Sequence, residues 1–164
     1  MAKRFSGKCL FSAPYAFIPD VQSMYRGVMP TQFRMIWHKN QMRKDPAVTA
    51  WVVNPSQHFM VNKESLAFFP NLRVVVTPST GRNHIDLADC RKKGVAVYSL
   101  LDDRPGLESI SASAEFTFFL LLNSLRRLDT AMREVSARRW RKNEDKMRGH
   151  ELDGKKVGLV GFGR

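Results

Sequence analysis

The chain has 164 residues, 43% of them hydrophobic and 26% charged, which excludes a disordered chain and leaves room for about one domain with a real core. Its most apolar run, 116–122, is far shorter than the roughly 20 residues that span a bilayer, so no membrane segment is expected. The formal charge of +12 favours an anionic partner, such as nucleic acid, an acidic surface or a phosphate-bearing cofactor, or it is simply a basic surface.

Cysteine and histidine usage indicates an intracellular chain without a metal site. Cys9 and Cys90 are far apart, which favours reduced thiols in a cytoplasmic protein. No secretory signal is visible, because the short apolar run after Arg4 is interrupted by Pro14. None of the four histidines has metal-ligand spacing to Cys, Asp or Glu.

Short apolar runs alternate with short helical patterns up to residue 99. Strands are expected at 9–11, 33–37, 48–53, 72–77 and 95–99. Helices are expected at 21–26, 63–69 and 86–93, with Asp20, Asn62 and Asp86 as their N-caps. This alternation predicts an α/β fold with a parallel, doubly wound sheet.

After a linker at 101–106 the character of the sequence changes. One long helix is expected over 109–128, and its Phe and Leu side chains surround it so fully that it should be buried on most sides. Glu115 would then need a structural hydrogen bond. Residues 126–148 are strongly basic with interleaved acids, which predicts a solvated, ion-paired helix. Nucleic-acid binding is the sharper alternative, although no matching motif is present.

Two glycine turns are candidate sites. The loop 79–84 follows the clearest strand, and Gly81 would let backbone N–H groups approach a small anion closely, although an ordinary turn explains the same residues equally well. His84 in this loop is a weak candidate for a general base. A turn at 152–154 leads into a final strand at 157–160. Gly161 and Gly163 then fill the first two glycine positions of G-x-G-x-x-G, and the alternative is a strand ended by a tail.

Four segments in order resemble the D-isomer-specific 2-hydroxyacid dehydrogenases: 79–87, 94–97, 110–122 and 151–164. The resemblance implies a flavodoxin-like parallel sheet with helices on both faces over 1–104. It also implies an interdomain helical segment over 105–150, and over 151–164 the first strand and partial glycine turn of a truncated Rossmann domain.

The resemblance also implies a chemistry. Thr80 and Gly81 would bind the carboxylate of a small 2-hydroxy or 2-oxo acid. NAD or NADP would be held by Gly161, Gly163 and Arg164 at a helix N-terminus. Hydride would pass between the nicotinamide and C2 of the substrate.

The family's catalytic His, Glu and Arg follow the glycine motif, so no residue of this chain is assigned a catalytic role. The expectation is an incomplete fragment that is inactive alone. Arg82 and the segment 101–107 vary within the family, so the substrate stays open. Two alternatives remain: a non-catalytic protein that forms homo-oligomers through an exposed apolar helix 109–128, and a basic nucleic-acid-binding module.

Overall fold

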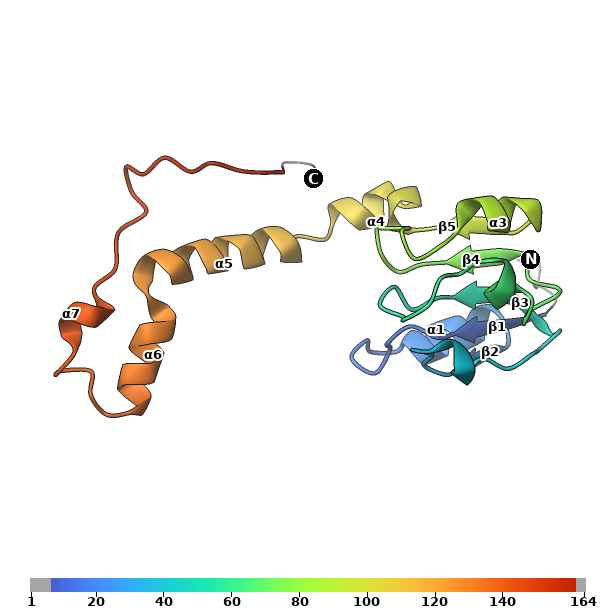
Figure 1. Cartoon of the computed structure of the whole chain (residues 1–164), viewed down its shortest axis with the longest axis horizontal. Coiled ribbons are helices and arrows are strands. Elements are labelled where there is room, and N and C mark those ends of the chain that lie inside the picture. The colour runs from blue at the N-terminus through green and yellow to red at the C-terminus, as the bar shows by residue number, and fades with distance from the viewer. Residues whose placement is uncertain (1–6, 162–164) are drawn as a thin grey trace. The chain divides into compact units, whose positions relative to one another are not determined.

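The computed structural model describes residues 7–161, and its contacts divide the chain into two compact units, Met1–Glu108 and Ser109–Arg164. The first unit contains the strands and the second contains helices and extended chain (Figure 1).

The first unit is built on a five-stranded sheet with the order β2-β1-β3-β4-β5. Every pairing is parallel, and the strands are β1 (Lys8–Phe11), β2 (Thr31–Phe33), β3 (Val48–Val52), β4 (Val74–Val76) and β5 (Ala96–Tyr98). This is the flavodoxin-like strand order, in which parallel neighbours are joined by crossover connections. The predicted α/β fold is therefore confirmed.

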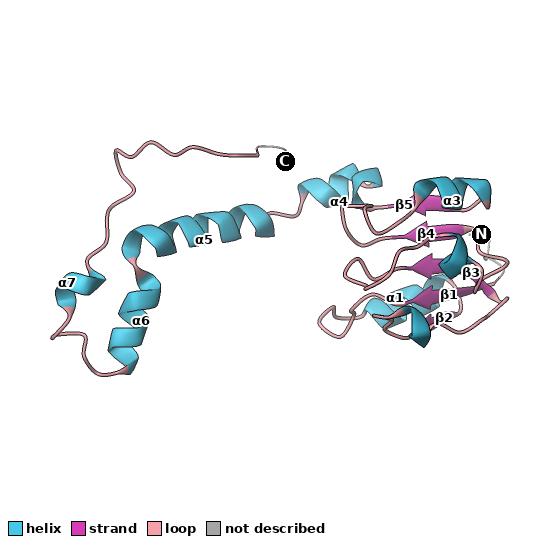
Figure 2. Cartoon of the chain, in the orientation of Figure 1, coloured by secondary structure: helices cyan, strands magenta, loops and turns pink. Residues whose placement is uncertain are grey.

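Helices lie on both faces of this sheet (Figure 2). They are α1 (Val21–Val28), α2 (Lys63–Leu66) and α3 (Leu87–Lys92). Successive strand residues point to opposite faces, so they enter different apolar clusters. The cluster under α2 and α3 includes Leu10, Trp51, Leu66 and Cys90. The cluster under α1 includes Phe11, Val21 and Val52.

The helix caps follow the sequence in two cases out of three. The Asn62 side chain accepts from the Ser65 N–H at 3.2 Å, and the Asp86 side chain accepts from the Ala88 and Asp89 N–H groups at 2.9 and 3.0 Å. Asp20 is wrong as a side-chain cap: it occupies the cap position of α1 in the left-handed region, with φ 57°, and its side chain accepts no cap hydrogen bond. Its backbone C=O accepts from the Ser23 hydroxyl instead.

The second expected strand, 33–37, is wrong in position. β2 is an edge strand that pairs with β1, and Phe33 lies beside Phe11, the last residue of β1. The partner strand therefore ends where the predicted strand was to begin. Beyond β2 the Arg34 N–H still donates to the Phe11 C=O at 3.0 Å, and the Ile36 N–H donates to the Ser12 C=O at 3.4 Å. The helix expected at 63–69 is also shorter than predicted, since α2 ends at Leu66.

The expected linker at 101–106 has regular structure. A 3-10 turn spans Leu100–Asp102 and α4 spans Arg104–Glu108. The Asp103 carboxylate accepts from the Gly106 N–H at 3.2 Å, and Leu107 is buried, so α4 packs against the rest of the first unit. We call residues 99–108 the connector, because the second unit begins at Ser109.

The second unit contains α5 (Ala112–Arg126), α6 (Leu128–Ser136) and α7 (Glu144–Met147). The long helix is confirmed in its body. The continuous basic helix over 126–148 is wrong, because Arg127 and Arg138 have φ values of 51° and 54°, which no right-handed helix accommodates. The expected ion pairs form, for example Arg139 to Glu134 at 3.1 Å.

The apolar circumference of α5 is not covered in this structure. Phe116 and Phe118 are 60% and 62% exposed, against the expectation of burial. The physical reason is that the remaining elements of the unit are two short helices and extended chain, which cannot surround a helix. Glu115 is exposed and accepts a hydrogen bond from the Ser111 hydroxyl at 2.5 Å.

The final strand expected at 157–160 is also absent from the described structure. The turn before it is confirmed, with Gly154 at φ 68° and a Lys155 N–H to Leu152 C=O bond of 3.1 Å. Val157, Leu159 and Val160 then run on with exposed side chains. A strand needs a neighbour for its backbone hydrogen bonds, and no described strand of the second unit provides one.

Candidate functional site

A row of buried polar side chains follows the strands of the first unit at their carboxyl ends. The residues are Ser12, Asn54, Thr77 and Ser99, which come after β1, β3, β4 and β5. Because the strands are parallel, these positions share one edge of the sheet, where open α/β folds bind ligands. The Ser12 hydroxyl, for instance, donates to the Val52 C=O and accepts from the Trp51 indole, both at 2.9 Å.

The loop 79–84 leaves this edge after β4 and is fixed from within. The Ser79 hydroxyl donates to the Gly81 C=O at 2.9 Å, so the contact of 2.9 Å between the Ser79 and Thr77 hydroxyls has Thr77 as its donor. Since a trans peptide points its C=O and N–H in opposite directions, the Arg82 N–H faces away from Ser79. The polar side chains thus organise the backbone of the loop.

The predicted anion-binding residues present free backbone donors. Thr80 and Gly81 are exposed, and no hydrogen bond within the described chain uses the N–H of either residue. A Cβ placed on Gly81 would meet only the Asn83 Oδ1, at 3.5 Å. Adjacent free N–H groups at a turn form a concavity suited to a carboxylate or phosphate oxygen.

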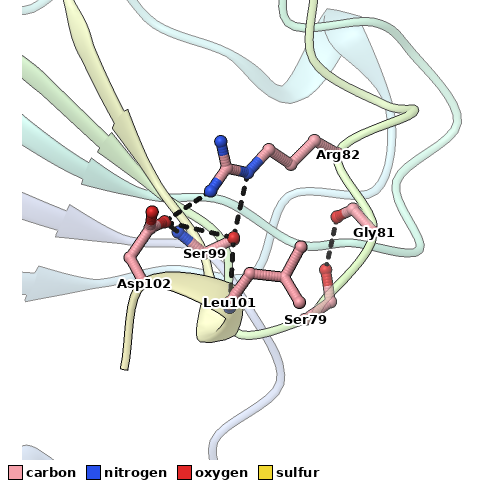
Figure 3. Close-up of polar contacts among 6 residues, drawn as sticks. All are labelled: Ser79, Gly81, Arg82, Ser99, Leu101 and Asp102. Atoms are coloured by element: carbon pink, nitrogen blue, oxygen red, sulfur yellow. Dashed lines mark hydrogen bonds and ion pairs between the residues drawn. The ribbon is translucent and has the colours of Figure 1, made fainter. Parts of the chain in front are cut away.

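Arg82 fastens this loop to the beginning of the connector (Figure 3). Its Nε donates to the Ser99 hydroxyl at 2.9 Å, and its Nη2 donates to Asp102 Oδ2 at 2.5 Å. The same carboxylate oxygen accepts from the Ser99 N–H at 2.8 Å. This backbone hydrogen bond, together with the Arg82 guanidinium, lowers the pKa of Asp102 below its ordinary value, so the pair is charged at neutral pH.

The sequence interpretation missed Ser99 and Asp102. A signal for half of the arrangement was present, because Ser99-Leu100-Leu101-Asp102 has the S-x-x-D spacing of a capping box. The Asp102 carboxylate accepts from the Ser99 N–H at 2.8 Å, as that motif requires, and the Ser99 hydroxyl also accepts from the Leu101 N–H at 3.3 Å. The partnership with Arg82, 20 residues away from Asp102, has no comparable signal.

His84 lies in the interior and not on the surface of the loop. It is 9% exposed, and its Nε2 is buried without a hydrogen-bond partner among the described residues. Burial lowers the pKa of the imidazole below its ordinary 6.5, which keeps the ring neutral. The weak candidacy of His84 as a general base gains no support from this placement.

The structure describes only one of the three predicted cofactor residues, Gly161. Gly161 has φ 89° and open space where a Cβ would lie, as a close phosphate approach requires. Gly163 and Arg164 lie outside the described residues. The chain before Gly161 is not a strand, and no helix N-terminus adjoins Gly161 within the described range, so the described part of this turn does not form a dinucleotide cradle.

The described residues give little support for a metal site, a membrane-spanning helix or a nucleic-acid interface. No group of three or more His, Cys, Asp or Glu side chains between residues 7 and 161 lies close enough to hold a metal ion. None of the described helices is long and apolar enough to cross a bilayer. In the basic segment 126–148, several of the arginines are engaged in exposed ion pairs. Nucleic-acid binding by this segment stays a prediction, and retention on nucleic acid that falls steeply with salt would test it.

Family models match most of the chain in two adjoining parts. Residues 39–117 match the catalytic domain of the D-isomer-specific 2-hydroxyacid dehydrogenases. Residues 118–164 match the NAD-binding domain of the same family. The order of the two matches is the order expected from the four resembling segments.

Curated relatives and solved structures agree with these matches. The chain is 35% identical over 103 residues to the glyoxylate/hydroxypyruvate reductase HPR3 of Arabidopsis thaliana, a match covering 63% of this chain and 30% of that protein. It is 38% identical over 106 residues to a glyoxylate reductase of Thermofilum pendens, with the same two coverages.

Among solved structures, the NADPH-dependent glyoxylate/hydroxypyruvate reductase of Sinorhizobium meliloti, in complex with NADP and malonate, superposes with a TM-score of 0.72. The superposition has 21% identity and covers 97% of this chain and 47% of that one, so it bears on the fold. A D-isomer-specific 2-hydroxyacid dehydrogenase of Polaromonas gives a TM-score of 0.71 at 23% identity, over 90% of this chain and 46% of that one. The chain belongs to the D-isomer-specific 2-hydroxyacid dehydrogenase family, whose members depend on NAD or NADP.

Proposed function

We propose that the first unit is the substrate-binding part of an NAD(P)-dependent oxidoreductase that acts on the CH–OH group of small D-2-hydroxy acids. The observation that carries this proposal is the pair of free backbone donors at Thr80 and Gly81, on a loop at the carboxyl edge of the sheet. We assign residues 1–104 to this domain, 105–150 to an interdomain helical segment and 151–164 to the beginning of the nucleotide-binding domain.

The substrate class follows from the donors and from the relatives. Two exposed N–H groups suit one carboxylate, which every 2-hydroxy and 2-oxo acid carries. The relatives named above are reductases of glyoxylate and hydroxypyruvate, both small 2-oxo acids. We therefore propose a substrate of that size, bound by its carboxylate at Thr80 and Gly81.

Calorimetric titration tests this assignment. Glyoxylate added to the 164-residue polypeptide should bind saturably, and acetaldehyde, which lacks the carboxylate, should not. Binding that is equal for the two compounds would contradict the proposal, because the N–H donors would then have no part in recognition.

We further propose that the polypeptide of residues 1–164, taken alone, neither holds NAD(P) nor turns substrate over. The support is that Val157–Val160 is not a strand and that Leu159 and Val160 are 61% and 105% exposed, so the platform for the glycine turn is not formed. NADH titrated against this polypeptide should show no saturable change in fluorescence. Saturable binding at micromolar NADH would refute this part.

A second candidate function, a non-catalytic interaction surface, is favoured by the apolar face of α5. Phe118, Phe116 and Leu120 are each at least 49% exposed, and uncovered patches of this kind mark association sites. We propose that α5 supports homo-oligomers, and Phe118→Glu should shift the sedimentation profile towards monomer. A wild-type chain that stays monomeric at high concentration would contradict this.

We also propose that the protein works in the cytoplasm, on the ground that its two cysteines, Cys9 and Cys90, are buried free thiols. Imaging of the labelled protein in its own cells would test this, and a signal confined to a secretory compartment would contradict it.

A further inference from the structure

The Arg82 guanidinium joins two segments that are distant in sequence and different in role. One is the loop 79–84, which holds the free N–H groups of Thr80 and Gly81. The other is the connector, whose first turn carries Ser99 and Asp102 (Figure 3). A further hydrogen bond between these two segments runs from the Leu100 N–H to the Ser79 C=O, at 3.1 Å.

The partners of Arg82 are also the groups that shape the connector turn. Asp102 Oδ2 accepts from the Ser99 N–H at 2.8 Å, from the Ser99 hydroxyl at 3.2 Å and from Arg82 Nη2 at 2.5 Å. One carboxylate oxygen therefore serves both the cap of the turn and the arginine. A change in the turn must alter the Arg82 contact, and a displaced Arg82 must alter the turn.

The 3-10 turn Leu100–Asp102 also determines where α4 begins. Asp103 follows Asp102 directly, accepts from the Gly106 N–H and, through its C=O, accepts from the Leu107 N–H at 2.9 Å. Leu107 is 7% exposed, so the helix is anchored at its end as well. Arg82 is thus linked to Leu107 through its hydrogen bond to Asp102, the peptide bond from Asp102 to Asp103, and the hydrogen bond between Asp103 and Leu107.

From this arrangement we propose that Arg82 is a positioning residue that couples the anion-binding loop to the connector. Its hydrogen bonds hold the Thr80 and Gly81 donors in their binding geometry when the connector has the described conformation, and anion binding stabilises that conformation in return. Reciprocity of this kind is required of any coupling between two equilibria. The role of the coupling in carboxylate affinity rests on the proposed function. The hydrogen bonds of Arg82 to Ser99 and Asp102, which we call the latch, rest on contacts alone.

Amide hydrogen exchange of the 164-residue chain, resolved by NMR, tests the latch without any ligand. Arg82→Met should accelerate exchange about tenfold both at Ile85, whose N–H donates to the Arg82 C=O and so reports on the loop, and at 103–107, because it removes both side-chain contacts of Arg82 at once. Asp102→Asn keeps an oxygen for the Ser99 N–H and removes the charge, so it too should accelerate exchange in the loop, across the contact. Arg104→Met is the matched control, since Arg104 is exposed in the connector and has no described side-chain contact, and it should leave the loop unchanged.

The same samples with glyoxylate test the coupling. Saturating glyoxylate should slow exchange at 103–107 in the wild-type chain and not in Arg82→Met. If loop exchange in Arg82→Met and Asp102→Asn equals that of the wild type, the latch is refuted, whatever the affinity for glyoxylate. If the wild-type chain fails to bind glyoxylate while both variants still accelerate loop exchange, the proposed function fails and the latch stands. If Arg82→Met fails to fold, loop exchange in Asp102→Asn decides whether the latch exists, because the turn keeps its cap in that variant.

Discussion

The two units of the chain treat their apolar residues in opposite ways. The first unit buries Trp51 and Phe69 completely, at 0% exposure, between a sheet and the helices on its face. In the second, none of the described residues is buried, and Phe116 and Phe118 of α5 are largely exposed. Helix propensity can form α5 without cover, because its hydrogen bonds are internal. A strand such as 157–160 cannot form in that way. The difference shows that an apolar sequence pattern predicts that a segment needs to be buried. The pattern does not say which other segment will bury it.

The largest expected effect comes from emptying the core of the first unit. Trp51→Ala removes a fully buried indole and its hydrogen bond to Ser12, so it should cost about 3–5 kcal/mol of the free energy of unfolding. Trp140→Ala is the matched change in the second unit, where the indole is 50% exposed, and should cost less than about 0.5 kcal/mol. Urea unfolding followed by circular dichroism measures both. Equal losses would abolish the distinction between the units.

A smaller effect is expected at the loop. Gly81 has no positive φ, and an added Cβ would meet Asn83 Oδ1 at an ordinary 3.5 Å, so Gly81→Ala should leave the stability of the first unit unchanged. The methyl group beside the N–H donors should nevertheless weaken glyoxylate binding about tenfold, about 1.4 kcal/mol. Gly27→Ala, in α1 with nothing within 4 Å of its Cβ, is the control for a harmless methyl group. Unchanged affinity in Gly81→Ala would move the anion site elsewhere.

His84 makes the stability of the first unit depend on pH. Its pKa is lowered by burial in the folded state, so the unfolded chain binds the extra proton more readily. The stability that this neutral ring provides is therefore complete above the unfolded pKa of 6.5 and is lost as pH falls towards the folded value. Urea midpoints should fall between about pH 7.5 and about pH 5.5, and His84→Leu should flatten that slope. An identical slope in the variant would assign the pH dependence to other groups.

The smallest expected effect is in the surface ion pairs of the second unit. The Glu134 carboxylate accepts from Arg139 at 3.1 and 3.2 Å and from Asn143, and these hydrogen bonds lower its pKa below the ordinary value. Glu134→Gln should accelerate amide exchange in α6 by about twofold, since the Arg139 side chain of the pair is 55% exposed and solvent weakens such a pair. Glu144→Gln, which touches a simpler exposed pair with Arg148, should change less. A large loss of helicity in Glu134→Gln would show that the second unit depends on this cluster.

Much of the first unit could be predicted from sequence because its signals are local. The run around Val48–Val52 is β-branched and apolar, and the Asp86 cap precedes a short helix ended by Gly94 at φ 72°. The errors depend on information from elsewhere in the chain. β2 begins at Thr31 because the partner strand β1 sets its register. The break at Arg127 depends on a left-handed arginine, a conformation with no sequence signature.

In the candidate site, too, the features with a local sequence signal were predictable, and the contacts between distant residues were not. Gly81 and its neighbours were visible as a turn after a strand, and the structure places that loop at the carboxyl edge with free donors. The contact from Arg82 to Asp102 was not visible, since only the capping box at Ser99 has a local pattern. Sequence patterns thus indicated the loop that carries the proposed anion donors, whereas the contact from Arg82 to Asp102 became visible only in the fold.

Site-resolved NMR can test whether the backbone N–H groups of Thr80 and Gly81 bind the carboxylate of a small 2-oxo acid. Glyoxylate titrated into the 15N-labelled chain should shift the backbone amide signals of Thr80 and Gly81 along one saturable curve, with smaller shifts in the connector. Signals of Thr80 and Gly81 that stay fixed, while amides of the basic segment 126–148 move, would contradict the account and assign the acid to the second unit.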